Sequence, residues 1–179
     1  KISSIDEIPL AVNSSNPAVM QFTFRAASES DYAWLWQLKR LTMRTYVEAM
    51  WGGWDDAAQE DFFRRNFLPA TIRVIVVDGQ DVGLLHVERE TEALFLANLQ
   101  ILPEFQNRGL GSAVVRRVIE EAHAMGLGVV RLQVLKSNQP ARRLYERLGF
   151  ELTQEGSMHD QMRLSRVTNE RCEGRAGYP

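Results

Sequence analysis

A glycine-containing stretch, Gln106–Ala113, carries the pattern in this chain that is most suggestive of chemistry. It follows an apolar run, Leu94–Leu102, and it precedes a helix-like segment that extends to about Met125. Glycines permit tight turns and let backbone N–H groups approach a ligand closely. The first turn of a helix has unpaired N–H donors and about half a positive charge, to which Arg108 adds a full one. A strand, a glycine turn and a helix start together predict an anion site, and the usual anion is phosphate.

Two familiar phosphate-binding loops fit this stretch poorly. A Walker loop requires Gly-x-x-x-x-Gly-Lys-Ser/Thr, and this stretch has no such lysine. A dinucleotide fingerprint requires a third glycine three places after Gly111, where Val114 stands instead. A nucleotide-binding protein is therefore a weak reading, because both the lysine and a magnesium-binding Ser or Thr at the right offset are missing.

The loop fits the pattern Gln/Arg-x-x-Gly-x-Gly/Ala, and so it resembles the pyrophosphate loop of the GNAT superfamily of N-acetyltransferases. Pro103–Gly111 resembles the passage from strand to helix in that superfamily, and Asn138–Phe150 resembles its second signature. The two stretches occur in the expected order, and the resemblance covers Phe22–Leu164. It implies an acetyl-CoA-dependent N-acetyltransferase that moves an acetyl group to a primary amine by direct attack.

The resemblance also implies how acetyl-CoA, the co-substrate, would be held. Backbone N–H groups from Arg108 to Ala113 would bind its two phosphates, assisted by the Gln106 and Arg108 side chains. Main-chain groups from Leu99 to Leu102 would pair with the pantetheine amides as an added strand does. The full set implied for the cofactor is Leu99, Ile101, Leu102, Gln106, Asn107, Arg108, Gly109, Leu110, Gly111, Ser112, Ala113, Asn138 and Ala141.

Tyr145, seven residues after Asn138, matches the superfamily's tyrosine that protonates the departing thiolate. A tyrosine hydroxyl has a reference pKa of about 10 and keeps its proton at neutral pH, whereas a thiol of pKa about 8.5 leaves as a thiolate. From spacing alone, Tyr145 would be a helix tyrosine packed on the core with its hydroxyl at the surface. By the same reasoning, Asn138 serves as a helix cap, a role compatible with a contact to the cofactor arm.

Two features of the acceptor side stay open. The superfamily places the segment between the first two helices over the acceptor entrance, so Tyr46, Trp51 and Trp54 would line a partly apolar pocket. The alternative is that the two tryptophans are core aromatics that cover a loop. An apolar entrance favours a small aromatic or alkyl amine, and a peptide N-terminus, a lysine side chain, a polyamine or an aminoglycoside remain alternatives. The base is also open, between ordered water and the candidates His86, Glu88, Glu92, Glu104, Asp55, Asp56, Glu60 and His159.

Composition limits the remaining classes. The 179 residues are 45% hydrophobic and 25% charged, which is typical of one globular domain, and the net charge of −2 argues against a nucleic-acid partner. A single cysteine, Cys172, favours a reducing cytoplasm, and no apolar run is long enough to predict a membrane span. The histidine and cysteine spacings predict no metal site. The expected partner is a small-molecule or peptide amine, with a homodimer left open.

Hydrophobic periodicity predicts an arm over residues 1–20, an acetyltransferase domain over 21–165 and a tail over 166–179. The predicted strands are Gln21–Arg25, Ile72–Val77, Val82–Val87, Leu94–Leu102, Val129–Leu135, Phe150–Glu155 and Met158–Leu164. The predicted helices run from about Ser28 to Met50, Asp55 to Phe67, Gly109 to Met125 and Pro140 to Leu148. This order predicts an α+β (α/β) fold with a mixed, mostly antiparallel sheet of six to seven strands and helices on both faces. The resemblance adds a splayed parallel strand pair at the centre.

A binding module is the alternative to an enzyme. Such a protein would keep the acyl-CoA pocket and sense its ligand without catalysis. The presence of Tyr145 favours the enzyme, because a sensor does not need an acid for a leaving group.

Overall fold

The computed structural model describes residues 20–165, and the predicted tail, the rest of the predicted arm and Cys172 lie outside that range. The strands are β1 Thr23–Ala26, β2 Ile72–Val77, β3 Gln80–Arg89, β4 Leu94–Ile101, β5 Val129–Leu135, β6 Glu151–Glu155 and β7 His159–Ser165. The helices are α1 Tyr32–Trp51, α2 Asp56–Arg65, α3 Leu110–Ala124 and α4 Gln139–Arg147, with three short 3-10 turns at Glu29–Asp31, Pro69–Thr71 and Pro103–Phe105.

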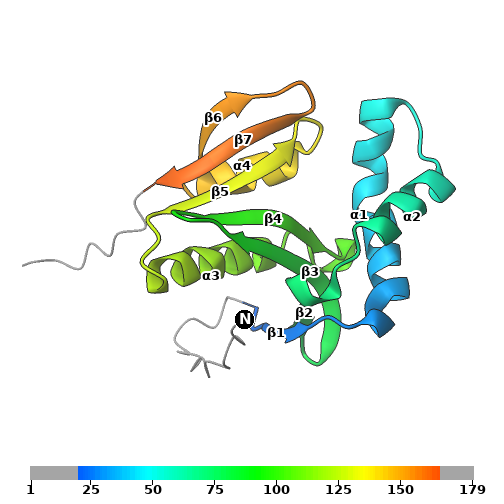
Figure 1. Cartoon of the computed structure of the whole chain (residues 1–179), viewed down its shortest axis with the longest axis horizontal. Coiled ribbons are helices and arrows are strands. Elements are labelled where there is room, and N and C mark those ends of the chain that lie inside the picture. Colours follow the sequence, from blue (N-terminus) through cyan, green and yellow to red (C-terminus); the bar gives the residue numbers. More distant parts are fainter. Residues whose placement is uncertain (1–19, 166–179) are drawn as a thin grey trace, which may run out of the picture.

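The strands form one sheet in the order β1-β2-β3-β4-β5-β7-β6 (Figure 1). Every neighbouring pair is antiparallel except β4 and β5, which are parallel and are joined through α3. This confirms the predicted mixed sheet. The β2–β3 turn is shorter than predicted, because Asp78 and Gly79 both adopt positive φ angles, 49° and 78°. Such a two-residue turn lets pairing begin at Gln80, opposite Val77.

The parallel pair at the centre is splayed. β4 pairs with β5 over three positions only, Leu94–Leu96 against Val130–Leu132. On its other side β4 shifts register, since His86 lies opposite Asn98 and Val87 lies opposite Leu96. Ala97 is therefore an extra residue on β4, and such a bulge bends a strand and increases its twist. The bend occurs where the pairing with β5 stops, so the two strands diverge beyond it.

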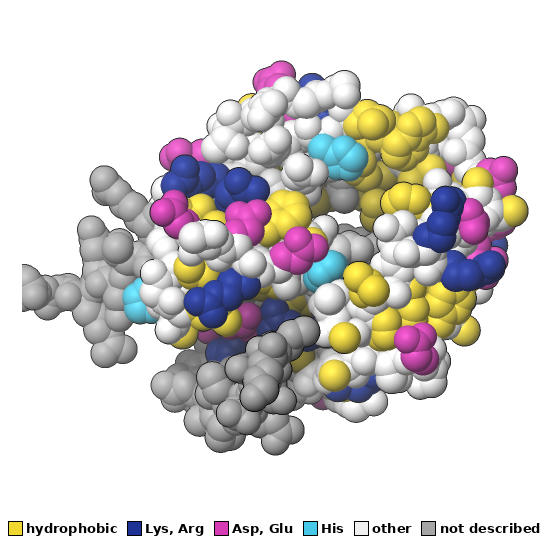
Figure 2. Space-filling view, in the orientation of Figure 1, with side chains coloured by type: hydrophobic (Ala, Val, Ile, Leu, Met, Phe, Trp, Pro, Cys, Tyr) yellow, Lys and Arg dark blue, Asp and Glu magenta, His cyan; other side chains and the backbone are white. Residues whose placement is uncertain are grey.

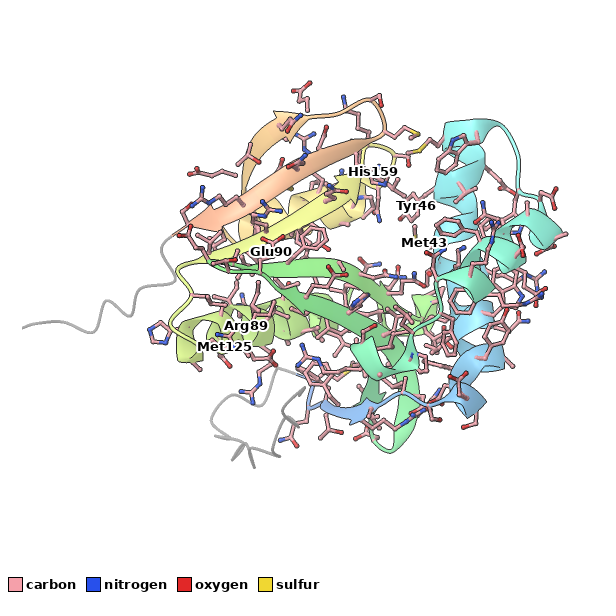
Figure 3. The ribbon with its side chains drawn as sticks, in the orientation of Figure 1. Met43, Tyr46, Arg89, Glu90, Met125 and His159 are labelled. Atoms are coloured by element: carbon pink, nitrogen blue, oxygen red, sulfur yellow. The ribbon has the colours of Figure 1, made fainter. Side chains whose placement is uncertain are left out.

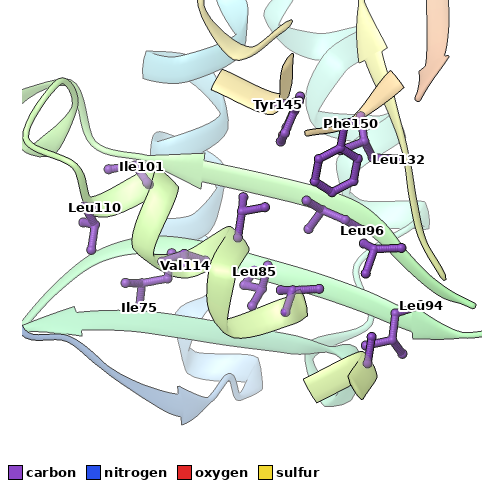
Figure 4. Packing of buried hydrophobic residues seen from close by; sticks show 14 of the residues in the cluster. Ile75, Leu85, Leu94, Leu96, Ile101, Leu110, Val114, Leu132, Tyr145 and Phe150 are labelled. Carbon is purple, nitrogen blue, oxygen red and sulfur yellow. The ribbon is translucent and has the colours of Figure 1, made fainter. Parts of the chain in front are cut away.

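Alternating side chains of the central strands face two hydrophobic cores. On one face, α3 and α4 cover the larger core, which includes Ile75, Leu85, Val114 and Tyr145 (Figure 4). On the other face, α1 and α2 cover a smaller core around Leu35, Leu38, Leu84 and Leu102. The helices therefore lie on both faces of the sheet, as predicted.

Two glycines set the ends of the helices nearest the expected site. Gly52 ends α1 in the left-handed region at φ 77°, so Trp51 is the last residue of the helix instead of the first residue of a loop. Gly109, at φ 82°, is the N-cap of α3. Both conformations are ones that glycine adopts without steric cost.

Candidate functional site

A cluster of backbone donors forms where β4 passes into α3. Asn107 and Gly109 both have positive φ, 58° and 82°, so successive N–H groups turn toward one concave surface. The N–H groups of Leu110, Gly111 and Ser112 are in the first turn of α3, where a helix offers them no acceptor. The predicted donor series ends one residue earlier than expected, because the Ala113 N–H donates to the Gly109 carbonyl at 3.0 Å.

These donors border a cavity of about 350 Å³, called here the donor cavity. The predicted cofactor residues that line it are Leu99, Ile101, Gln106, Asn107, Gly109, Gly111, Ser112, Asn138 and Ala141. Gly111 lets α3 pack closely against α4, since an added Cβ there would lie 3.1 Å from Leu144 Cδ1. The Gln106 amide nitrogen donates to the Ile101 carbonyl at 2.7 Å, so this side chain braces the end of β4.

Four predicted cofactor residues do not line the donor cavity. Leu102 and Leu110 have side chains buried in the cores, and the Leu102 N–H donates to Val82 at 2.8 Å. The Arg108 guanidinium lies over the Phe105 ring, 5.9 Å from its centroid. The Ala113 N–H donates to the Gly109 carbonyl within α3, so it is not free to donate into the donor cavity.

A second cavity of about 780 Å³, called here the acceptor cavity, lies between α1, α2 and the splayed strands. Figure 2 shows the molecule hollowed near its centre, with hydrophobic side chains gathered on the side of α1. Ala97, Asn98 and Leu99 of β4 face Gln133, Val134 and Leu135 of β5 across this space. The divergence of β4 from β5 therefore produces the opening.

The two cavities meet at a shared wall. Five residues line both of them: Met43, Leu99, Asn138, Ala141 and Tyr145. They come from α1, β4 and α4, together with Asn138, which directly precedes α4. An acyl-CoA with its phosphates in the donor cavity would present its acyl group at this wall.

Tyr145 is the titratable member of the shared wall. Its side chain is 8% exposed and lies 5.8 Å from the Phe150 ring, centroid to centroid. Burial disfavours the phenolate and raises the pKa of Tyr145 to about 12. The hydroxyl is therefore a proton-bearing donor throughout the neutral pH range.

Two interactions hold α4, and with it Tyr145, in place. The Asn138 side chain caps the helix by accepting from the Ala141 N–H at 3.2 Å, so the predicted capping role is present. Arg142 donates to Asp160 on β7 at 2.7 Å, and Asp160 is only 1% exposed. A buried charge pair of this kind fixes the helix relative to the strand, since separation would leave the carboxylate unpaired.

The predicted acceptor residues lie in three different environments. Trp51 lines the acceptor cavity and is 56% exposed, whereas Tyr46 lines the donor cavity. Trp54 lines neither cavity. It stacks on Trp36 at a centroid distance of 6.2 Å, and its Nε1 donates to Asp56 at 2.9 Å, so it anchors the start of α2.

Of the candidate bases, only His159 lines the acceptor cavity. His86 is instead 3.4 Å from Glu88, and Asp55 caps α2 by accepting from the Ala57 N–H at 2.9 Å. Figure 3 shows His159 at the start of β7, with Tyr46 and Met43 of α1 opposite it. His159 is thus the base-capable side chain that the fold brings to the acceptor side.

Sequence reasoning found only Trp51 of one wall of the acceptor cavity. Lys39, Met43, Val47 and Trp51 recur every four residues along α1 and all line it. This spacing places side chains on one face of a helix. The four-residue spacing was the available signal in the sequence. It does not read as an apolar stripe, because its first member, Lys39, is charged.

Within residues 20–165, no group of three or more His, Cys, Asp or Glu side chains is arranged to hold a metal ion. The helices of that range are also too short or too polar to cross a membrane.

The chain belongs to the acetyltransferase (GNAT) family, whose model matches residues 32–150. Among solved structures, PaiA N-acetyltransferase from Thermoplasma acidophilum, crystallised with coenzyme A, has a TM-score of 0.68. That similarity covers 82% of this chain and 99% of that one at 15% identity, which establishes a shared fold.

Curated relatives match over shorter segments. The ribosomal protein bS18-alanine N-acetyltransferase of Escherichia coli is 40% identical over 55 residues, or 31% of this chain and 37% of that enzyme. Thialysine N-epsilon-acetyltransferase of Bos taurus is 34% identical over 67 residues, or 37% of this chain and 39% of that enzyme. The matches thus span well under half the length of these relatives.

Proposed function

We propose that this protein transfers the acetyl group of acetyl-CoA to a primary amine. The observation that carries the proposal is the shared wall: a phosphate-type donor cavity and a separate acceptor cavity meet at Tyr145. Acetyl-CoA in the donor cavity and an amine in the acceptor cavity would place the thioester and the amine together beside a buried, protonated hydroxyl. Proximity of this kind removes much of the entropic barrier to a bimolecular reaction.

The proposed reaction is one direct displacement. The lone pair of the neutral amine attacks the acetyl carbonyl carbon, and the C–N bond forms as the carbonyl oxygen becomes an oxyanion. The oxyanion collapses, the C–S bond breaks and the electron pair leaves on sulfur. Tyr145 donates its proton to that sulfur, and the amine proton passes to His159 directly or through water. The products are the acetamide and coenzyme A.

His159→Gln tests the base. The variant keeps a polar side chain at the acceptor cavity but removes the proton acceptor, so kcat/KM should fall about ten- to hundredfold at neutral pH, with water retaining part of the relay. The deficit should shrink as the pH approaches the pKa of the amine, about 10.4 for a lysine-like acceptor, because the amine then loses its proton unaided. The check is a pH profile of kcat/KM for both proteins. A deficit that stays constant with pH would assign His159 a structural role instead.

Acetyl-CoA should raise the melting temperature of the protein markedly, because a ligand that binds only the native state stabilises it by mass action. ATP and NAD should raise it much less, since they share the diphosphate but lack the pantetheine arm that the splayed strands receive. Differential scanning fluorimetry at equal ligand concentrations measures all three. Equal shifts would indicate an unselective anion site and would contradict the proposal.

The second candidate function is an acyl-CoA sensor. It shares the donor cavity but has no need of a separate acceptor cavity of about 780 Å³. A thiol-release assay with acetyl-CoA and a panel of amines separates the two functions. Amine-dependent release of coenzyme A supports the enzyme, and tight binding without release by any amine supports the sensor.

A further inference from the structure

Lys39 is a half-buried cation inside the acceptor cavity with unused hydrogen-bonding capacity. Its Nζ lies between three aromatic rings, 5.2 Å from the Phe62 centroid, 5.7 Å from Trp36 and 5.8 Å from Phe63. It donates one hydrogen bond, to the Gln59 carbonyl at 3.3 Å. An ammonium group has three donors, so two remain for a ligand.

The charge on Lys39 is not compensated by a carboxylate of residues 20–165. Desolvation lowers the pKa of Lys39, and no acidic neighbour opposes the effect. The cavity has one other permanently charged side chain, Arg65, which pairs with Asp61. A desolvated cation of this kind is stabilised strongly by an anion that enters the cavity.

No described Asp or Glu lines the acceptor cavity. A polyamine or an aminoglycoside carries several positive charges, and its additional ammonium groups would meet Lys39 with no carboxylate to offset the repulsion. The remaining wall is mostly apolar, with Met43, Val47, Phe62 and Phe95 among its residues. The cavity therefore matches a ligand with an apolar body and a negative group.

Lys39 lies along α1 from the shared wall, so an anion bound to Lys39 would lie away from the reacting amine. Lys39 is one turn of α1 before Met43, which lies on the shared wall with Tyr145. The four-residue step from Lys39 to Met43 corresponds to about 6 Å along the helix axis. An acceptor can therefore place its amine at the shared wall while its anionic group extends along α1 to the ammonium of Lys39.

We propose that the acceptor is an apolar primary amine that carries a carboxylate, and that Lys39 binds this carboxylate. The inference rests on the proposed acetyl transfer and specifies its substrate class. It separates short peptides and ω-amino acids with a free carboxylate from simple alkylamines and polyamines. Lys39 acts here in binding and takes no part in the transfer of the acetyl group.

The test compares acceptors in which the carboxylate is several bonds from the amine and is the group that changes: phenylalanylleucine with phenylalanylleucinamide, and 6-aminohexanoate with hexylamine. For the wild type, kcat/KM should be about ten- to hundredfold higher with the carboxylate, as one charge-assisted hydrogen bond predicts. Lys39→Met keeps an apolar stem between the rings and should abolish this preference by raising KM. Lys39→Arg should restore part of it. The Kd of acetyl-CoA should be unchanged in both variants.

Arg44→Met is the matched control, because Arg44 is on the same helix and pairs with Glu48 outside both cavities. It removes an equal charge and should leave the preference intact. Equal use of both members of each pair by the wild type would overturn the inference and leave acetyl transfer standing, as would an equal loss in the Arg44 variant. Absence of turnover with every amine, despite bound acetyl-CoA, would instead reject the proposed function.

Discussion

Tyr145→Phe should lower turnover by about 10²–10⁴, the usual contribution of a well-placed general acid. The change removes one hydroxyl and keeps the ring against Phe150, so packing and cofactor affinity should survive. An interaction made only in the transition state lowers kcat and kcat/KM together and leaves the Kd of acetyl-CoA unchanged. Steady-state kinetics with acetyl-CoA and acceptor varied separately, together with direct titration of acetyl-CoA, measure each quantity.

Tyr32→Phe provides the matched control, because it removes another tyrosine hydroxyl from a residue that lines neither cavity. Its turnover should equal that of the wild type. A raised acceptor KM with normal turnover in Tyr145→Phe would assign the hydroxyl to acceptor binding. Normal kinetics throughout would show that the thiolate leaves unassisted or that another group donates the proton.

Tyr145→Phe also tests the burial of the Tyr145 hydroxyl. The unfolded chain ionises Tyr145 near its reference pKa of about 10, whereas the folded protein holds the proton until about pH 12. The unfolded state is therefore favoured progressively as the pH rises from about 10 to about 12. Over this range the melting temperature of the wild type should fall more steeply than that of Tyr145→Phe.

Gly111→Asp should weaken acetyl-CoA binding by at least about a hundredfold. The new carboxylate would lie in the first turn of α3, beside the N–H groups that are proposed to bind the phosphates, and it would repel the phosphates. Each charge-assisted hydrogen bond contributes about 1.5–3 kcal/mol, and each 1.4 kcal/mol corresponds to a factor of ten. Isothermal titration calorimetry of the folded variant measures the change.

Gly128→Asp serves as the charge-matched comparison. A Cβ at Gly128 would meet nothing within 4 Å, and this residue lines neither cavity. Its affinity for acetyl-CoA should match that of the wild type. If Gly111→Asp folds and binds as tightly as Gly128→Asp does, the α3 turn is not the phosphate site.

The strands and helices could be predicted from sequence where one face is buried, because burial imposes a strict period on the residues. Val114, Val115 and Val118 of α3 are fully buried at the predicted helical spacing. The splay was predicted by resemblance alone, since its visible cause is a bulge at Ala97. An alanine within an apolar run gives no sign of a bulge, because the extra residue is defined by its partner strand.

The residues of the site were less accessible to sequence reasoning, because their positions depend on contacts between distant segments. Trp51 and Trp54 are three residues apart, yet one lines the acceptor cavity and the other stacks on Trp36. Similarly, Lys39 is an ordinary helix lysine until α2 places Phe62 and Phe63 beside it. The loop at Gly109 and Gly111 was predictable, because its backbone conformation is determined locally.

The short parallel pairing at the centre has a mechanical consequence for the whole domain. Only the three paired positions of β4 and β5 link the strands β1 to β4 with the strands β5 to β7, so the sheet is hinged at one end. The helix α3 contacts both sides and acts as a splint across the hinge. Because Leu99 and Asn138 belong to opposite sides and border both cavities, rotation about the hinge would resize both together. Entry of the donor would thereby set the width of the channel available to the acceptor.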